Sequence, residues 1–376
     1  MYIKRILYQK IIDNLEENKV IVIYWPRRVG KTTLINEILK DYKDKYLLVS
    51  WEDIFIHEYL GSKSIEKLKN FIWDYKLLVI DEAQKIPEIW WNLKLIVDHI
   101  PWIKIIATWS SSFDLSNKIW EPLVWRKRTL QLFPISIKEI SESQNFFQIM
   151  WNLEQYLIYW AYPEIFAKKD NKSKEIYLRE IISSYLYKDI LELEWIRYSD
   201  KILKLLALIA FQIWKEVSLS ELWRQLEMNK NTVERYLDLL EKSFVLFRIK
   251  GFSRNLRKEI SKSSRYYFYD LWIRNAVISN FNPLSLRNDI WELWENFLII
   301  ERLKKKSYFD LFSNNYFWRT HDQKEIDWIE DYDWKLHAYE FKWWDKLVKV
   351  PKSFMEAYPD SSFEVINKNN FLDFVL

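Results

Sequence analysis

The sequence contains no cysteine, only three glycines and no long uninterrupted apolar run. Without cysteine, the chain has no disulfide framework, no thiolate metal site and no cysteine nucleophile. No apolar stretch approaches the roughly 18 residues that a helix needs to cross a bilayer. Charged residues interrupt the segment 1–18, which also lacks the small-residue cleavage site of a secretory signal. We therefore expect a soluble, cytoplasmic protein without a membrane partner.

Charge and hydrophobic content narrow the class of protein. The 57 basic and 53 acidic residues nearly balance, for a formal net charge of +4, so composition alone does not mark a nucleic-acid-binding protein. Hydrophobic residues make up 49% of the 376 positions, which is enough to pack cores and excludes a wholly disordered chain. A chain of this length typically folds into roughly two to three domains.

Glycine is scarce where tryptophan is abundant. The chain has 3 glycines and 22 tryptophans, whereas glycine ordinarily makes up about 7% of a globular chain. Several tryptophans stand where a tight turn or loop calls for glycine, which takes positive φ freely: Trp25, Trp109, Trp120, Trp125 and Trp334. Others lie in apolar or strand-like contexts that suit a true tryptophan: Trp294, Trp318 and Trp328. We hypothesise that many of these codons are UGA, read here as tryptophan but decoded as glycine in the source lineage. The alternative is a chain that is genuinely rich in tryptophan.

Five short apolar runs predict the strands of a parallel sheet. They span residues 20–25, 46–51, 77–81, 103–108 and 128–133. Helical patterns lie between these runs, and such alternation is typical of an α/β fold whose parallel sheet is covered on both faces. Farther along, the pattern changes in four steps: a helical segment at 140–212, two short helices and two strand-like runs at 217–270, a helix at 287–306 and a strand meander at 308–345.

A phosphate-binding pattern follows the first run. The segment WPRRVGKT, residues 25–32, is a Walker A pattern with tryptophan in its first glycine position. In this pattern Lys31 reaches the β- and γ-phosphates and Thr32 holds Mg²⁺, while backbone N–H groups cradle the phosphates. We expect the nucleotide to be bound by the following residues: Trp25, Pro26, Arg27, Arg28, Val29, Gly30, Lys31, Thr32, Thr33 and Asp81. A real tryptophan at position 25 would weaken this binding, because the backbone must turn tightly there.

A second strand supplies acids where nucleotide hydrolysis needs them. The run LLVID, residues 77–81, ends in Asp81 and is followed by Glu82. Asp81 would assist Thr32 in holding Mg²⁺, and Glu82 would act as general base toward the attacking water. The alternative, a buried strand that simply ends in two acids, carries less weight beside a Walker A pattern.

Three motifs together, WPRRVGKTTL, LLVIDEAQKIP and IIATWSSSFDL, resemble the AAA-type P-loop ATPases of bacteria and archaea that carry a restriction-endonuclease-like domain of unknown function. The resemblance covers roughly residues 1–145. It implies that a hydroxyl at the end of the fourth strand senses the γ-phosphate, and Ser110 is favoured over Thr108. It also implies that Arg126 is an arginine finger or γ-phosphate sensor; the alternative is a surface arginine in a basic run. Glycine would restore the family pattern at its points of departure: Trp25, Trp109, Trp120 and Trp125.

A helix–turn–helix pattern followed by a basic hairpin predicts a winged helix. Ser218 and Glu221 form a capping box before the first helix, and Asn231 is expected to cap the second. Strand-like runs at 244–249 and 265–270 enclose a basic loop. Several basic side chains would meet nucleic-acid phosphates: Lys230, Arg235, Arg254, Arg257 and Lys258. The alternative is a module that packs against protein.

The C-terminal part carries the acid and lysine pattern of PD-(D/E)xK nucleases. Asp327 lies on one expected strand, and Glu340 and Lys342 follow two residues apart on the next, so this pair shares a strand face. Asp327 and Glu340 would hold Mg²⁺, Lys342 would orient or deprotonate a water, and Glu295 from the preceding helix would complete the site. The segments YFWRTHDQKEIDWI and HAYEFK resemble the domain that follows these ATPases, which implies a restriction-endonuclease-like fold. The alternative is a charged solvent face.

These patterns predict an α/β protein in four parts: a P-loop ATPase domain at 1–140, a helical segment at 141–212, a winged helix at 213–270 and a PD-(D/E)xK-like, restriction-endonuclease-like domain at 271–376. We expect a Mg²⁺-dependent, AAA-type ATPase that binds ATP and whose C-terminal modules act on DNA or RNA; a second copy of the chain is a further expected partner. Two alternatives stay open: a nucleotide-sensing DNA-binding regulator, and a partner-binding switch with a silent nuclease-like domain. Glu82 favours turnover, because a pure sensor needs no general base.

Overall fold

The chain folds into two compact units, each with its own sheet. The computed structural model describes residues 3–25, 28–110, 123, 125–159, 162–184, 199–212, 218–253, 264–320, 324–345 and 348–376. The first unit comprises Met1–Ile135 with Tyr162–Ala167, and the second comprises Ser136–Ala161 with Lys168–Leu376. The expected division into four parts stays a prediction.

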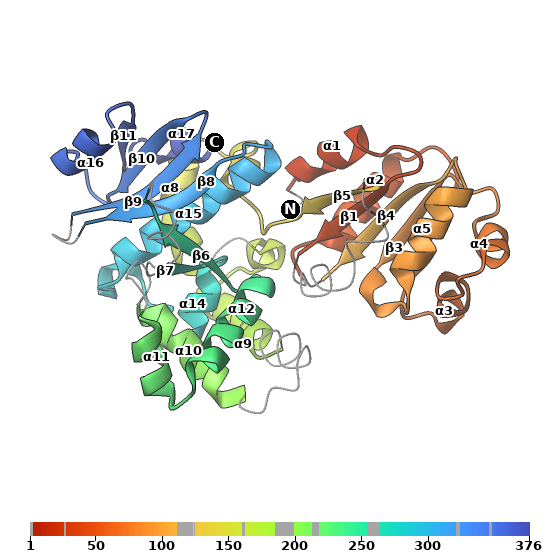
Figure 1. The fold of residues 1–376 in the computed structure, drawn as a ribbon, viewed down its shortest axis with the longest axis horizontal. Coiled ribbons are helices and arrows are strands. Elements are labelled where there is room, and N and C mark those ends of the chain that lie inside the picture. Colours follow the sequence, from red (N-terminus) through yellow and green to blue (C-terminus); the bar gives the residue numbers. More distant parts are fainter. Residues whose placement is uncertain are drawn as a thin grey trace. The chain divides into compact units, whose positions relative to one another are not determined.

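A five-stranded parallel sheet forms the centre of the first unit (Figure 1). Its strands are β1 (Val20–Tyr24), β2 (Tyr46–Ser50), β3 (Leu77–Asp81), β4 (Lys104–Trp109) and β5 (Lys127–Gln131), in the order β2-β3-β4-β1-β5. All four pairings are parallel, which confirms the predicted α/β fold. β1 and β3 are buried over four consecutive residues each, because helices cover both faces of a parallel sheet.

The helices of the first unit lie on both sides of this sheet. Figure 1 shows α1 and α2 on one side and α4 and α5 on the other. The bounds are α1 Ile6–Asp13, α2 Lys31–Asp41, α3 Ile54–Leu60, α4 Ile65–Ile72, η1 Ala83–Lys85, α5 Ile89–His99 and the short η2 Pro163–Ala167. The core between β1, β3, β4 and α5 is made of fully buried aliphatic side chains such as Val22, Ile80 and Leu93. This packing holds the carboxyl ends of β1, β3 and β4 at one edge.

A six-stranded mixed sheet forms the centre of the second unit. Its strands are β6 (Leu246–Gly251), β7 (Ser264–Phe268), β8 (Asn314–Arg319), β9 (Glu325–Tyr332), β10 (Lys335–Phe341) and β11 (Ser362–Ile366), in the order β11-β10-β9-β8-β6-β7. The hairpin expected as the wing, β6 with β7, belongs to this sheet because β6 pairs in parallel with β8. One sheet therefore crosses the boundary expected between residues 270 and 271.

Helices make up the rest of the second unit. The bounds are α7 Ile137–Ser141, α8 Phe146–Tyr159, α9 Asn171–Ser184, α10 Ser199–Phe211, α11 Leu219–Leu226, α12 Lys230–Lys242, α14 Leu271–Val277, η4 Leu284–Leu286, α15 Ile290–Tyr308, α16 Lys352–Ala357 and α17 Phe371–Val375. Ser218 caps α11 as expected. The cap of α12 is Asn229, whose side chain accepts from Thr232 N–H, and not Asn231; the helix begins before the position that the periodicity indicates. Among the described residues, no helix combines the length and apolarity that crossing a membrane requires.

Tryptophans occupy two kinds of backbone position. Trp73, Trp125 and Trp334 have positive φ of 47°, 71° and 63°, a conformation that side chains with a Cβ rarely take. Trp334 follows Asp333, also at positive φ, in the two-residue turn between β9 and β10. This is the type I′ geometry that Asp-Gly usually fills, and it confirms the predicted turn. Trp25 and Trp109 do not have positive φ; both are buried.

Candidate functional site

The phosphate loop joins the end of β1 to the start of α2. Gly30 caps α2 with a φ of 97°, so the loop reverses through a left-handed residue. Lys31 is buried; its Nζ donates to the carbonyl oxygen of Trp25 at 2.6 Å and lies 3.7 Å from Glu82 Oε1. Lys31 is thereby held under the loop. The expected contacts of Pro26 and Arg27 lie outside the described residues.

The side chain of Trp25 is directed into the protein. Its ring is buried and lies 4.5 Å from the ring of Phe133, and its backbone N–H donates to the carbonyl of Trp109 at 3.2 Å. Arg5 donates to the carbonyls of Val29 and Phe133 and ties the loop to the segment after β5. Phe133 and Arg5 were not singled out from the sequence, since neither belongs to a motif.

Oxygen donors for a metal ion converge at the ends of α2 and β3. Thr32 Oγ1 lies 3.5 Å from Asp81 Oδ2, and Asp81 Oδ1 accepts from Thr108 Oγ1 at 2.5 Å. Mg²⁺ prefers hard oxygens and is usually held by one or two protein groups together with substrate phosphates. The donor set of Thr32 and Asp81 fits that ion. Thr108 thereby fixes the side chain of Asp81.

Glu82 has a strained backbone and two well-defined neighbours. Its φ of 52° and ψ of 47° are left-handed, and its N–H donates to Thr108 Oγ1 at 2.8 Å. Strain of this kind is kept where the surroundings over-determine it, often at functional sites. Glu82 Oε2 accepts from Gln84 Nε2 at 2.7 Å, and the same nitrogen lies 2.6 Å from Ser110 Oγ. The structure thus brings together Lys31, Glu82 and Ser110, and adds Gln84, whose chemistry the motif spacing does not reveal.

Arg126 lies far from the phosphate loop of its own chain. Its carbonyl accepts from Val20 N–H, at the start of β1, whereas the loop follows the end of β1 at Tyr24. Its guanidinium forms an ion pair with Asp98 of α5. The length of β1, at roughly 3.3 Å per residue, separates the two ends. The role of Arg126 as a finger stays a prediction, and it requires the nucleotide of another copy.

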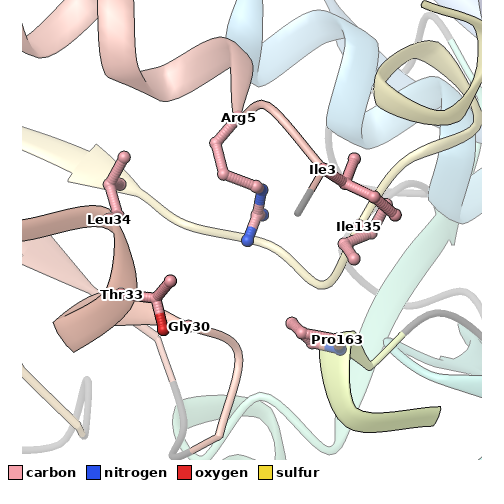
Figure 2. Close-up of a pocket in the computed structure, with 7 residues that line it drawn as sticks. All are labelled: Ile3, Arg5, Gly30, Thr33, Leu34, Ile135 and Pro163. Carbon is pink, nitrogen blue, oxygen red and sulfur yellow. The ribbon is translucent and has the colours of Figure 1, made fainter. Parts of the chain in front are cut away.

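A small apolar pocket adjoins the phosphate loop in the first unit. It encloses about 120 Å³. In Figure 2 the side chain of Arg5 reaches between the N-terminal segment and α2. The lining residues come from the N-terminal segment, the loop and α2, and the segments after β5 and at η2: Ile3, Arg5, Gly30, Thr33, Leu34, Ile135 and Pro163. The hydrogen bonds of Arg5 to Val29 and Phe133 hold its guanidinium beside this space.

The second unit gathers the four residues expected for a nuclease-like site. The β9–β10 register pairs Trp328 with Tyr339, so Asp327 and Glu340 are opposite each other on one face. Asp327 Oδ2 accepts from Phe341 N–H at 2.9 Å, and Lys342 Nζ lies 2.6 Å from Glu340 Oε1. Glu295, on α15, accepts from Tyr267 Oη at 2.6 Å. Asp327 and Glu340 share a face of the sheet, and all three acids are buried.

Arg265 is a buried cation within this acidic group. It is 1% exposed. Its Nη2 lies 2.8 Å from Glu325 Oε2, its Nη1 lies 3.8 Å from Glu295 Oε1, and its guanidinium covers the ring of Phe317 at 4.5 Å. The sequence pattern does not reveal Arg265, because it lies on β7, distant in sequence from the acids. Only the folding of the sheet brings it next to them. Its positive charge partly neutralises Glu295 and Glu325.

Burial dominates the protonation of these acids. Burial, followed by the charge of Asp327, raises the pKa of Glu295 to about 8. The same two causes raise the pKa of Glu340 to about 7, although Lys342 opposes them. Burial also raises the pKa of Asp327. Crowded, desolvated carboxylates hold their protons in this way unless further positive charge enters.

The expected metal site of the second unit is not assembled. Across the part of the chain that the structure describes, no three or more His, Asp or Glu side chains stand close enough together to hold a metal ion. Asp327 uses one oxygen for Phe341 N–H, and Glu340 is paired with Lys342. The residues have the right chemistry for Mg²⁺ but not the convergence, so their role as metal ligands stays a prediction.

The expected nucleic-acid contacts are only partly within the described residues. Lys230 opens α12 and lies 3.7 Å from Glu234 on the exposed face of that helix. Arg235 also lies on α12. The other three basic residues named above lie outside the described residues: Arg254, Arg257 and Lys258. The winged-helix assignment stays a prediction.

Three family models match successive parts of the chain. Residues 17–141 match the family described as "AAA domain". Residues 150–284 match "Domain of unknown function (DUF8612)", and residues 292–372 match "Domain of unknown function (DUF4143)". The first match coincides with the sheet and loop described above.

Relatives align over much of the chain. The "Uncharacterized protein MJ1544" of Methanocaldococcus jannaschii is 24% identical over 97% of this chain and 88% of its own length. The "Uncharacterized protein Rv2008c" of Mycobacterium tuberculosis is 23% identical over 71% of this chain and 58% of its own length. The chain therefore corresponds to only part of the mycobacterial protein.

Solved structures show distant likeness. A signal-transduction ATPase with numerous domains from Pyrococcus horikoshii has 13% identity and a TM-score of 0.32, covering 81% of this chain and 46% of that one. A point variant of Thermotoga maritima RuvB has 15% identity and a TM-score of 0.30, covering 64% of this chain and 85% of that one. The family match and the geometry of β1, β3 and the phosphate loop agree: residues 17–141 of the first unit resemble an AAA domain and have the fold of a P-loop NTPase.

Proposed function

We propose that the protein is a Mg²⁺-dependent ATP hydrolase. The observation that carries this proposal is the meeting of Lys31, Asp81 and Glu82 at one edge of the first sheet. Lys31 Nζ lies 3.7 Å from Glu82 Oε1, and Asp81 lies 3.5 Å from the hydroxyl of Thr32. A phosphate-binding lysine, a metal-binding pair and an acid beside the phosphate site form the set that phosphoryl transfer to water requires.

Each side chain has a separate task in this mechanism. When ATP binds, Lys31 Nζ donates to phosphate oxygens in place of the carbonyl of Trp25. Its ammonium group has three N–H donors for these bonds. Thr32 and Asp81 would hold Mg²⁺, which would supply neutralisation of charge on the phosphates. Glu82 then loses its contact with Lys31, and its Oε1 accepts a proton from the attacking water. Thr108 holds the Asp81 side chain and the Glu82 backbone in place through its two hydrogen bonds.

The pocket beside Gly30 and Thr33 is proposed to hold the adenine ring. It is apolar, adjoins the phosphate loop and presents the flat guanidinium of Arg5 on one side. An aromatic base stacks favourably on a guanidinium plane. Ile135 and Leu34 would contact the edges of the base without demanding hydrogen bonds.

The second candidate function, a sensor with little turnover, uses the same contacts but does not need Glu82.

Two substitutions test the hydrolase. Lys31→Ala is expected to abolish ATP binding, because the phosphates lose their main cation. Glu82→Gln is expected to bind Mg²⁺-ATP with unchanged affinity and to lower kcat by about a hundredfold or more, the usual loss for a missing general base. Calorimetry and phosphate release measure the two effects. Unchanged turnover in Glu82→Gln would exclude this residue as the base, and parent protein that binds ATP without turnover would favour the sensor.

A pocket-filling substitution tests the adenine site separately. Ile135→Trp is expected to weaken ATP binding by about tenfold or more, roughly 1.4 kcal/mol, while inorganic triphosphate still binds. The added ring fills the space for the base and leaves the phosphate loop intact. Ile54→Trp is the matched control, since Ile54 is 83% exposed on α3. Equal loss of both ligands in Ile135→Trp would indicate a damaged loop instead of an occupied pocket.

We also propose that the second unit acts on nucleic acid through a winged helix and a nuclease-like site. The support is the shared sheet face of Asp327 and Glu340, with Lys342 beside Glu340 and with Glu295 of α15 in electrostatic contact with Asp327. Mn²⁺ is the probe: saturable binding to the full chain, removed by Asp327→Ala with ATP hydrolysis unchanged, is the expected result. Absence of Mn²⁺ binding would mean that Arg265 and Lys342 already neutralise this group and would favour a partner-binding module. DNA and RNA binding should weaken with salt if α12 meets phosphates.

Finally, we propose that many tryptophan positions are glycine in the natural chain. Three tryptophans with positive φ support this. Trp328 differs, because its Nε1 donates to Glu330 Oε1 at 3.1 Å, as a true tryptophan would. The protein made as written should bind ATP about tenfold or more weakly than Trp25→Gly, about 1.4 kcal/mol. Equal affinities by calorimetry would refute the steric argument at position 25, and UGG codons at the positions discussed would refute the recoding.

A further inference from the structure

We propose that Gln84 is a positioning residue that couples Ser110 to Glu82; the inference rests on the proposed ATP hydrolysis. Gln84 lies in η1, directly after the strained Glu82. Its Nε2 lies 2.7 Å from Glu82 Oε2 and 2.6 Å from Ser110 Oγ. One amide nitrogen therefore connects the acid after β3 to the hydroxyl after β4.

The orientation of the amide follows from the chemistry of its neighbours. An ionised carboxylate only accepts hydrogen bonds, so the nitrogen and not the oxygen of Gln84 must face Glu82. The nitrogen carries two hydrogens, one for Glu82 and one for Ser110. Ser110 Oγ is then an acceptor toward Gln84, and its own hydrogen can be donated elsewhere. A phosphate oxygen is a natural acceptor for it.

The two oxygens of Glu82 are thereby given different tasks. Oε2 is held by Gln84, while Oε1 faces Lys31 at 3.7 Å, on the side of the phosphate loop. A carboxylate held by one oxygen cannot rotate freely, so the other oxygen keeps its direction toward the nucleotide. The Gln84 carbonyl oxygen is buried and lacks a partner among the described residues, which costs free energy and is tolerated mainly where function requires it.

The consequence is a link between Ser110, which senses the terminal phosphate, and Glu82, the general base. When Ser110 donates to the terminal phosphate, its oxygen moves with that bond, and Gln84 transmits the shift to Glu82 Oε2. Gln84 itself touches neither the phosphate nor the water. It acts through Glu82, so its removal should lower turnover and leave nucleotide affinity nearly unchanged.

Gln84→Leu tests this link in the full chain. The expected result is a kcat about tenfold lower, with an ATP dissociation constant within about threefold of the parent, since a hydrogen bond to a charged group contributes a factor of this order. Gln9→Leu is the matched control: Gln9 Nε2 also donates to a carboxylate, Asp13 Oδ1 at 2.8 Å, on the exposed face of α1. It should not change kcat.

A double-mutant cycle separates coupling from a general structural effect. Ser110→Ala and Gln84→Leu combined should cost much less than the product of their single effects on kcat, because both break the same link. If Gln84→Leu does not fold, Gln84→Asn, which is one methylene too short to reach both partners, replaces it. If the effects of Ser110→Ala and Gln84→Leu on kcat multiply, the link is wrong. A parent-like kcat in Gln84→Leu, while Glu82→Gln is inactive, would also contradict it. Either result would leave the proposed hydrolase intact. A parent without turnover would overturn both this inference and the proposed hydrolase.

Discussion

At the scale of single residues, backbone conformation separates the tryptophans more sharply than burial does. Trp334 is fully exposed and has a φ of 63°, whereas Trp151 is 88% exposed within the helix α8. A Cβ is unfavourable at the first position and harmless at the second. The same substitution should therefore change stability in opposite directions at these two sites.

Trp334→Gly is expected to stabilise the second unit by about 1 kcal/mol. A left-handed residue with a Cβ costs about 1–2 kcal/mol, which glycine avoids, but the greater conformational entropy of glycine in the unfolded chain offsets part of this gain. Trp151→Gly is expected to destabilise it by about 0.5 kcal/mol through lower helix propensity. Urea unfolding of the two variants measures the difference. A loss of stability in both would mean that the turn tolerates tryptophan and would remove one support for glycine at position 334.

At the scale of elements, the acid face of β9, β10 and α15 makes stability depend on pH. Folding raises the pKa of Glu295 to about 8 and that of Glu340 to about 7, mainly through burial. A carboxyl whose pKa is raised on folding stabilises the native state in its protonated form. That contribution is complete below the unfolded pKa and is lost as the pH rises through the folded pKa.

We therefore expect the free energy of unfolding of the second unit to fall between about pH 5 and about pH 8. Glu295→Gln and Glu340→Gln should each remove part of this slope, since glutamine has no proton to lose. Glu364→Gln, on an exposed position of β11, is the matched control and should leave it unchanged. Urea unfolding at several pH values measures the slope. Stability that rises over this range would contradict the burial of these acids.

Local patterns and long-range pairings differ in what the sequence reveals. The strands β1 and β3 could be predicted, because apolar runs and flanking motifs lie within a few residues of each other. The turn at Asp333 could be predicted for the same reason. The pairing of β6 with β8 could not, because strand periodicity does not name a partner. Arg265 and Gln84 were missed since their importance arises only from neighbours brought in by the fold.

At the scale of the whole molecule, Arg126 could act as an arginine finger only on the nucleotide of a second chain. Arg126 lies beside the start of β1, whereas the phosphate loop of the same chain follows the end of β1. We expect Arg126→Ala to lose most ATP hydrolysis, and a mixture of Arg126→Ala with Lys31→Ala to recover part of it. In the mixture, one subunit has an intact nucleotide site and the other supplies the arginine. Arginine fingers provided by a partner act in this way.

The matched mixture combines Lys31→Ala with Glu82→Gln and should not recover activity, because both chains then have a defective site of their own. Phosphate release from the two mixtures, at equal total protein concentration, decides between them. Recovery in neither mixture would place Arg126 outside the reaction and leave it as a surface ion pair with Asp98.

The parallel pairing of β6 with β8 also has a consequence for protein synthesis. β6 and β7 are synthesised first, but the strand that covers the other edge of β6 comes only after α14 and α15. Until then, β6 presents unpaired backbone groups, and such edges readily join strands of other chains. A chain released early, after β7, would carry this open edge permanently. Premature termination in this region should therefore produce aggregates and not a smaller folded protein.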